Sequence, residues 1–312
     1  MSIVPITEEQ RKQLIEDISY DDAQMQSKIQ QVKEWMKKQP HLPQLPDEMS
    51  EKIIFTILLG TKMSTERTKY KLDTFYAMRH QFPEIFLNID PTLKDVRDSV
   101  DKIRYFPLSE MTDDGNIVIV LSFNPDKSRK CTTKDIKALF KRTVALNDIW
   151  FQRGELFRGQ YVLFDTSGLS ASHLTELPWL FMRKFAAFGQ EALPLRIKGI
   201  FIVNCPTFFD IILNVFKPIL KDKMKKRIQI FHNYGDLYKY IPQRILPADY
   251  GGDGLTVEES SRAWQKTIES VRESVIEEGK RMTDESKRPS DSVNDCGQIF
   301  GVNGTFIKLN ID

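Results

Sequence analysis

Apolar residues recur at steps of three and four through the first part of the chain. The recurring positions are Leu14, Ile18, Met25, Ile29, Val32 and Met36. This spacing predicts amphipathic helices, because one face of a helix repeats every 3.6 residues. Three prolines between residues 40 and 46 interrupt the pattern, and two further helices are predicted at 47–59 and 64–80.

From about residue 96, short apolar runs alternate with segments of helix length. The runs are NIVIVLSF (116–123), QYVLFD (160–165), GIFIVN (199–204) and RIQIFH (227–232). Continuous apolar strands with helix-length connections are typical of βα units, whose strands are buried on both faces. The sequence therefore predicts an α/β fold, with an N-terminal helical bundle followed by a mixed, largely parallel sheet.

The pattern divides the chain into a helical domain at 1–95, the α/β domain at 96–255 and a C-terminal part at 256–312. Thr256 and Glu259 fit a capping box that begins a long charged helix. The predicted packing stripe of this helix is Trp264, Ile268, Val271 and Val275. The polar segment 287–295 predicts a linker, and the weak alternation of 305–311 predicts a final strand.

Composition is that of a soluble globular protein, with 41% apolar residues, 28% charged residues and a formal net charge of +2. Three widely spaced cysteines, without a CxxC pair, argue against a disulfide framework and indicate a reducing compartment. The N-terminus has no apolar core of a signal peptide, and the longest apolar runs are far shorter than a membrane span. We therefore expect a cytoplasmic protein.

Motifs for catalysis or cofactor binding do not emerge from the sequence. The glycine-rich GGDG (251–254) has no P-loop lysine, and SGLS (167–170) lacks the GxSxG spacing of a nucleophile elbow. None of the four histidines has a second ligand at metal-binding spacing, and only His173 lies near the end of a predicted strand. The sequence predicts no enzyme activity, no metal and no cofactor.

Positive charge is concentrated in FKPILKDKMKKR (216–227), where six of twelve residues are Lys or Arg. The preceding segment, CPTFFDIILNVFKPIL (205–220), predicts a helix that is apolar on both sides. Such a helix is normally buried core. A helix that covers an apolar cavity and also meets lipid would need the same two stripes, with each basic residue contributing about 1 kcal/mol at an anionic surface.

Three motifs, in order, resemble the CRAL-TRIO family of lipid-binding domains. They are TFYAMRHQFPEIF (74–86), FDTSGLSASH (164–173), and the run from Leu193 to His232 followed by IPQRILPADYGG (241–252). The resemblance covers roughly residues 30–255 and is closest to the tocopherol-transfer and retinaldehyde-binding members, while the closing GTFIKLNID resembles the tails of insect members. It implies a sheet that forms the floor of an apolar pocket, closed by a mobile gate helix at about 206–220.

The resemblance also implies which residues line this pocket. The matching positions are Leu139, Leu146, Phe164, Phe185, Phe188, Leu195, Ile200, Phe209, Ile212 and Val215. Phe185 and Phe188 stand where tocopherol-binding members carry smaller aliphatic residues, which predicts a narrower or differently shaped cavity. Thr143, Asn147 and Ser170 are candidates to hydrogen-bond a ligand head group, with local capping as the alternative for Ser170.

Tocopherol-transfer members bind phosphatidylinositol bisphosphate through basic residues beside the gate. The four matching positions are all basic here, and Lys62 adds a fifth charge: Arg196, Lys198, Lys223, Arg227 and Lys62. Gly60, in LLGTK (58–62), stands where these members carry another basic residue. The resemblance therefore implies phosphoinositide binding of weaker selectivity.

Two functions of different classes follow. The first is a carrier of a tocopherol-like, retinoid or other terpenoid-like lipid that meets phosphoinositide-containing membranes transiently and peripherally. The second is a signalling or scaffold module that reads phosphoinositides without a transported ligand. Nucleic-acid binding is disfavoured, because the sequence pI is only about 8.2 and the basic run contains no interleaved aromatic residues.

Overall fold

The computed structural model describes residues 2–19, 21–126 and 131–289. Its N-terminal third is helical, as the periodicity predicts. The helices are α1 (Glu8–Ile18), α2 (Asp22–Lys37), α3 (Asp47–Gly60), α4 (Thr65–Gln81), α5 (Pro83–Phe86) and α6 (Lys94–Val100). The predictions at 47–59 and 64–80 are confirmed by α3 and α4. The first apolar stripe is shared by two helices, because Ser19 adopts a left-handed conformation with φ of 52° and ends α1.

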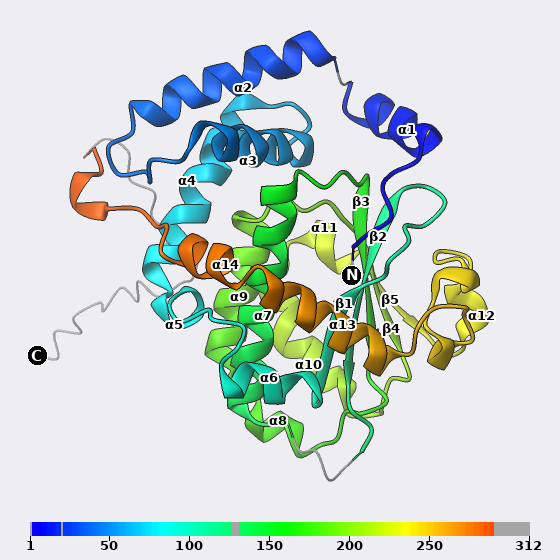
Figure 1. The fold of residues 1–312 in the computed structure, drawn as a ribbon. Helices are drawn as coiled ribbons and strands as arrows, with labels where there is room; N and C mark the ends of the chain where they lie inside the picture. Colours follow the sequence, from blue (N-terminus) through cyan, green and yellow to red (C-terminus); the bar gives the residue numbers. More distant parts are fainter. Residues whose placement is uncertain (1, 20, 127–130, 290–312) are drawn as a thin grey trace, which may run out of the picture.

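A mixed sheet of five strands forms the centre of the molecule (Figure 1). Its strands, in spatial order, are β1 (Ile103–Pro107), β2 (Asn116–Phe123), β3 (Gly159–Asp165), β4 (Ile197–Val203) and β5 (Ile228–Phe231). The four apolar runs became β2 to β5, all parallel, and β1 pairs antiparallel with β2. The predicted fold class is confirmed. The short strand β1 was missed, because its sequence IRYFP is neither a continuous apolar run nor a clear alternation.

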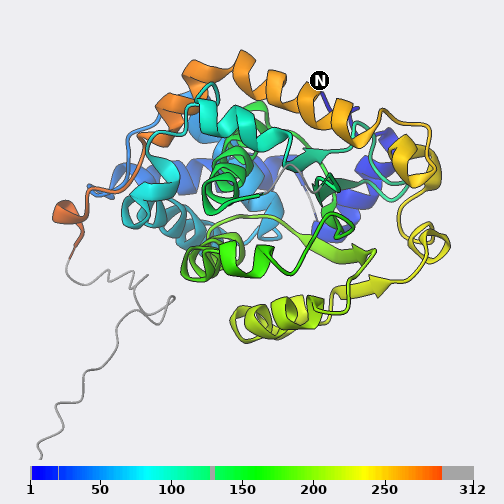
Figure 2. The ribbon, with the colours of Figure 1, turned by 90° about the horizontal axis from the view of Figure 1, so that it is seen from below.

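Helices of different lengths cover one face of the sheet. They include α7 (Thr133–Arg153), α8 (His173–Glu176), α9 (Trp179–Glu191), α10 (Phe209–Phe216) and α11 (Asp222–Lys225). Figure 2 shows α10 at the edge of the molecule, on the side opposite the last helices of the chain. The predicted helix at 205–220 is shorter in the structure. Pro218 lacks a backbone N–H, and Lys217–Ile219 forms a 3₁₀ turn instead of continuing α10.

The opposite face is covered by the segment that follows β5, while the last two helices run past β1 and pack on α7. These elements include α12 (Tyr234–Leu237), 3₁₀ turns at Gln243–Ile245 and Ala248–Tyr250, α13 (Val257–Ser270) and α14 (Arg272–Gly279). The predicted capping box of Thr256 and Glu259 is present at the start of α13. Trp264, Ile268 and Val275 are buried, as predicted, whereas Val271 separates two helices. The predicted strand at 305–311 and most of the predicted linker lie outside the described residues.

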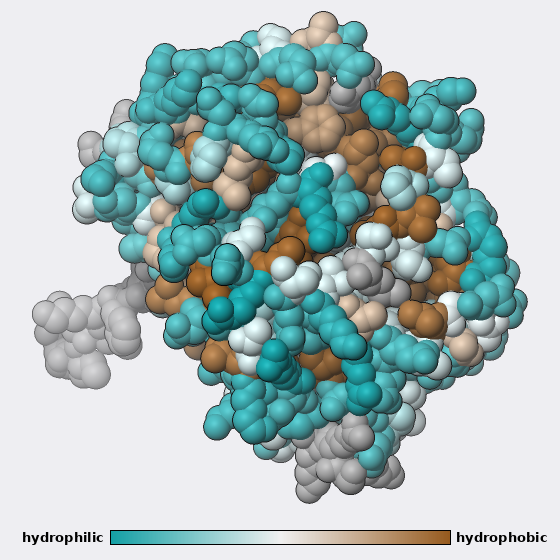
Figure 3. Space-filling view, viewed as in Figure 1, coloured by the Kyte–Doolittle hydropathy of each residue, from teal (hydrophilic) through white to brown (hydrophobic). Residues whose placement is uncertain are grey.

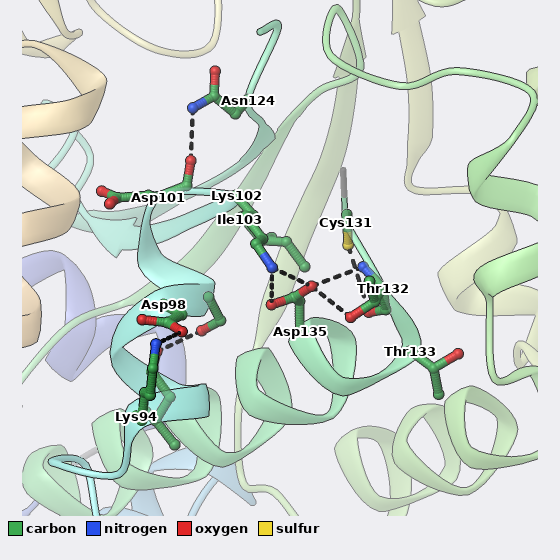
Figure 4. A network of polar contacts seen from close by, with 12 residues as sticks. Lys94, Asp98, Asp101, Lys102, Ile103, Asn124, Cys131, Thr132, Thr133 and Asp135 are labelled. Carbon is green, nitrogen blue, oxygen red and sulfur yellow. Dashed lines mark hydrogen bonds and ion pairs between the residues drawn. The ribbon is translucent and has the colours of Figure 1, made fainter. Parts of the chain in front are cut away.

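Two polar networks hold α7 against the rest of the molecule. At its amino end, Asp135 caps the helix through Thr132 and accepts hydrogen bonds from the Lys102 Nζ at 2.9 and 3.0 Å (Figure 4). In its second half, buried Asp148 pairs with Arg79 of α4, which also donates to the carbonyl of Glu278 in α14. These contacts fix α7 between the N-terminal helices and the sheet.

Candidate functional site

One face of the sheet carries apolar side chains that are only half-buried. The register places them side by side on four neighbouring strands: Leu121, Val162, Phe164, Ile200 and Ile228. We call these five residues the accessible face; Ile119 and Ile202, on the same side of the sheet, are only 1% and 2% exposed. The set includes two residues of β3, the central strand, whose side chains would be closed off if the helices packed directly on them. Their exposure indicates open space between the sheet and its covering helices.

On the opposite face of the same strands, four apolar side chains are packed tightly, whereas Tyr161 is half-buried. Val118, Val120, Leu163 and Phe201 are at most 1% exposed. A difference between two faces of one sheet cannot arise from strand propensity, because the residues on both faces are β-branched, aromatic or leucine. It arises from what covers each face. The accessible face is therefore the part of the fold that can take an apolar ligand.

The helix α10 closes the accessible face on one side. Phe209 packs against Phe164, with ring centroids 5.8 Å apart, and Ile212 is buried on the same side of the helix. Ile211 and Val215 are 53% and 37% exposed. The predicted pocket positions Phe209 and Ile212 thus lie on the inner side of α10, whereas Val215 lies on its outer side with Ile211.

The remaining predicted pocket residues fall into different environments. Phe185 is half-buried and lies against Phe140, with centroids 4.0 Å apart, whereas Phe188 is fully buried among Phe75 and Phe86. Leu139 is buried in the same hydrophobic cluster.

Leu146 and Leu195 lie apart from α10. Leu146 is fully buried and belongs to the cluster that contains the tightly packed strand residues. Leu195 lines a small cavity beside Gly60. The structure therefore brings Phe164 and Ile200 together with Phe209 and Ile212, and it places Leu146 in close-packed core.

Polar groups on α7 and β1 accompany this apolar surface. The Thr143 hydroxyl donates to the Leu139 carbonyl at 3.0 Å, and burial raises the pKa of Tyr105 to about 12 while a hydrogen bond with Thr143 opposes the shift. One turn later, Asn147 is 2% exposed, and its Oδ1 has no hydrogen-bond partner among the described residues. A buried hydrogen-bond acceptor without a donor lowers the free energy of unfolding.

Ser170, the third candidate for a head group, is engaged locally. Its hydroxyl lies 2.8 Å from the His173 Nδ1, and that nitrogen also accepts from the Ser170 backbone N–H at 2.9 Å. The arrangement is a turn stabilised by its own side chains. It favours the capping alternative for Ser170.

Basic residues gather at the amino ends of three neighbouring parallel strands. The residue directly before β3 is Arg158, the one before β4 is Arg196, and the one before β5 is Arg227. The second residue of β4 is Lys198. We call these four residues the basic edge. The Arg227 guanidinium donates to the carbonyl of Ile197, which places it beside the start of β4.

The charges of the basic edge influence one another. Burial lowers the pKa of Lys198, and the nearby Arg196 and Arg158 lower it further, against the opposing effect of Asp17. Burial also lowers the pKa of Arg196. Of the predicted phosphoinositide residues, Arg196, Lys198 and Arg227 therefore lie at one edge of the sheet. Lys223 is exposed on α11, and Lys62 is exposed just after α3.

Gly60 allows α3 to approach this edge. A Cβ atom at this position would lie 2.0 Å from the carbonyl oxygen of Pro194. A basic side chain at this position would therefore have no room. At Gly60, α3 therefore contributes a close backbone approach to Pro194 and no positive charge.

Several site residues were missed by the sequence analysis. Leu121, Val162 and Ile228 of the accessible face lie inside the predicted strands, but their common face follows from strand register, which the sequence does not show. Arg158 had a detectable signal: like Arg196 and Arg227, it stands at the start of an apolar run or within three residues before it. Parallel strands bring such positions to one edge of a sheet.

Comparison with known proteins identifies the class. Residues 104–252 match the family model described as CRAL/TRIO domain, and residues 21–96 match the model described as Pinta-like, UBA domain. Residues 104–252 are thus similar to a CRAL/TRIO domain, and the resemblance seen in the sequence is confirmed.

Several curated relatives carry the name alpha-tocopherol transfer protein-like. The mouse (Mus musculus) protein is 26% identical over 255 residues, which cover 80% of this chain and 71% of the relative. The human (Homo sapiens) protein is 26% identical over 72% of this chain and 64% of its own length. Rat (Rattus norvegicus) clavesin-1 is 28% identical over 44% of this chain and 38% of its own length.

Among solved structures, the crystal structure of Sfh5 aligns with a TM-score of 0.47 and 13% identity, covering 83% of this chain and 99% of the other. None of the helices in the described part of the chain has both the length and the hydrophobicity needed to cross a bilayer.

Proposed function

We propose that this protein is a carrier that encloses a hydrophobic small molecule between the accessible face and α10, and exchanges it at phosphoinositide-containing membranes. The observation that carries the proposal is the half-exposure of apolar side chains on the central strands of a covered sheet. Burial of some 400 Å² of ligand apolar surface would contribute about 10 kcal/mol before ordering costs. Binding of this kind requires no catalytic group.

The ligand class follows from the relatives and from the polar groups near the accessible face. Several relatives are named for alpha-tocopherol transfer, which makes tocopherol, retinoids and other terpenoid-like lipids the first candidates. Tyr105, Thr143 and the unpaired Asn147 Oδ1 supply a polar end to an otherwise apolar surface. A ligand hydroxyl group could donate a hydrogen bond to the Asn147 Oδ1, which favours a ligand that carries one.

Membrane contact is proposed for the outer side of α10 and the neighbouring basic residues. Ile211 and Val215 on α10 and Leu180 on α9 are exposed apolar side chains, and contact between Trp179 and Phe216 links the two helices. The exposed side chains in the following segment include Lys217, Lys221 and Lys223. Apolar residues flanked by cations suit an anionic membrane surface.

A transfer assay tests this function. Donor vesicles carry a fluorescent tocopherol analogue with a quencher, and acceptor vesicles contain phosphatidylcholine with or without phosphatidylinositol bisphosphate. We expect the protein to accelerate transfer, and more strongly when the acceptor contains the phosphoinositide. Fluorescence that rises no faster than without protein, for tocopherol and retinal analogues alike, would contradict the carrier function. Tight vesicle binding without transfer would favour a scaffold module.

A further inference from the structure

The last turn of α1 lies against the basic edge. Asp17 accepts two hydrogen bonds from Arg158, at 2.8 Å from Nε and 3.1 Å from Nη2, and its Oδ2 lies 3.7 Å from the Lys198 Nζ. The pKa of Asp17 is lowered, chiefly by the hydrogen bond from Arg158. A carboxylate of the protein thus occupies the position between two cations where a phosphate oxygen could bind. Figure 1 shows α1 beside the ends of β2 and β3.

Helix formation does not explain an acidic residue at this position. The carbonyl groups of the last turn carry partial negative charge, so a carboxylate there is unfavourable to the helix. The last turn of α1 contains no basic residue. Asp17 and the carboxyl end of α1 together present negative charge to the basic edge. They occupy the place that a bound anion would take there.

A small cavity lies beneath the same helix. Its lining includes Leu14 of α1, Gly60 of α3 and the segment Pro194–Arg196, and it has a volume of about 30 Å³. The Arg196 Nη1 is buried and has no hydrogen-bond partner among the described residues. A guanidinium nitrogen without an acceptor is a donor available to an anionic oxygen. Figure 3 shows hydrophobic residues at the surface next to α1.

We propose that the last turn of α1 is an internal competitor at the phosphate site. Asp17 holds Arg158 and Lys198 until a multiply charged lipid headgroup displaces it. The inference rests on the phosphoinositide binding proposed above, and it adds a threshold of affinity that a lipid headgroup must exceed. A singly charged lipid offers the two cations no more than Asp17 does, whereas a headgroup with several phosphates pairs with both and with Arg196.

The contacts of α1 make a partial displacement feasible. Gln10, in its first turn, donates to the Thr112 carbonyl at 2.9 Å, and Thr7 caps the helix. These contacts do not involve the basic edge, so the first turn can stay attached while the last turn moves. The buried side chains of Leu14 and Ile18 oppose this movement and set the threshold that a ligand must exceed.

The test compares Asp17→Asn with a matched change in the same turn. Glu16 is exposed and forms no ion pair with any residue that the structure describes, so Glu16→Gln alters net charge equally without freeing the basic edge. Sedimentation is measured with phosphatidylcholine vesicles that contain phosphatidylinositol bisphosphate, or phosphatidylserine instead. Because a partly exposed ion pair of this kind contributes on the order of 1 kcal/mol, we expect Asp17→Asn to bind both vesicles roughly fivefold more tightly. Glu16→Gln should bind as the wild type does.

Hydrogen exchange gives a second readout on the unmodified protein. Phosphoinositide vesicles should accelerate exchange of the amides of residues 14–18, while those of Gln10 and Arg11, which bond to Thr7, stay protected. Equal or weaker vesicle binding by Asp17→Asn would overturn the inference. If binding is then still lost on substitution of Arg196 and Lys198 by Gln, the proposed membrane function survives alone. Absence of vesicle binding by every variant would overturn both.

Discussion

Phe209 of α10 packs edge-on against Phe164 of β3, with ring planes inclined by 66°. This contact joins the helix to the central strand at the accessible face. Phe209 is on the buried side of α10, whereas Ile211 is on the exposed side of the same helix. We therefore expect the position of α10 to decide whether the accessible face is open or closed.

The two sides of α10 predict opposite effects of the same substitution. Ile212→Asp places a carboxylate on the inner side, where it would face apolar ligand and sheet, so we expect ligand binding in solution to fall by at least tenfold. Thermal unfolding should show a smaller loss, because α10 borders open space. Ile211→Asp is the control: it lies on the outer side and should retain binding in solution. Unfolding of the domain by Ile212→Asp would mean that α10 is ordinary core.

Open space at the accessible face can be tested by adding volume. Val162→Phe should cost less than about 1 kcal/mol of the free energy of unfolding, because the added ring can occupy the space next to β3, and it should reduce ligand uptake. Val120→Phe, on the tightly packed face between Phe106 and Leu163, should cost about 1–3 kcal/mol through overpacking. Chemical denaturation measures both. Equal losses would show that no such space exists.

The basic residues are predicted to act at membranes and not in the pocket. Replacing Arg196, Lys198, Lys223 and Arg227 by Gln should reduce binding to anionic vesicles by at least tenfold, since each cation contributes about 1 kcal/mol, and should leave ligand binding in solution intact. Four exposed lysines in or directly after other helices, replaced by Gln, provide a charge-matched control: Lys38, Lys94, Lys266 and Lys280. Unchanged partitioning of the first variant would refute the assignment.

The approach of α3 to Pro194 predicts a steric limit. Gly60→Ala places a Cβ against the Pro194 carbonyl, so we expect a loss of about 1–3 kcal/mol of the free energy of unfolding. Gly189, in α9, has nothing within 4 Å of an added Cβ. Gly189→Ala should therefore stabilise the protein by up to about 1 kcal/mol through helix propensity. A stable Gly60→Ala variant would show that α3 does not lie this close.

The sequence predicted the strands well because β2 to β5 are continuous apolar runs between helices. It could not predict the accessible face, since Val162 and Leu163 are similar residues on opposite faces, and only the covering elements distinguish their exposure. Likewise, the length of α10 was overestimated because apolar periodicity continues past Pro218. The contact of Asp17 with Arg158 spans 141 residues and depends on where α1 docks, which no local pattern reveals.

Native mass spectrometry of the purified protein measures ligand occupancy directly. The protein is examined as isolated, with organic extraction of bound molecules, and after incubation with tocopherol, retinal or phosphatidylinositol. The account predicts one apolar molecule per chain for at least one of these, and loss of that mass in the Val162→Phe variant but not in Ile211→Asp. A protein that carries no ligand as isolated and takes up none of the three would contradict the claim that this domain encloses a hydrophobic molecule.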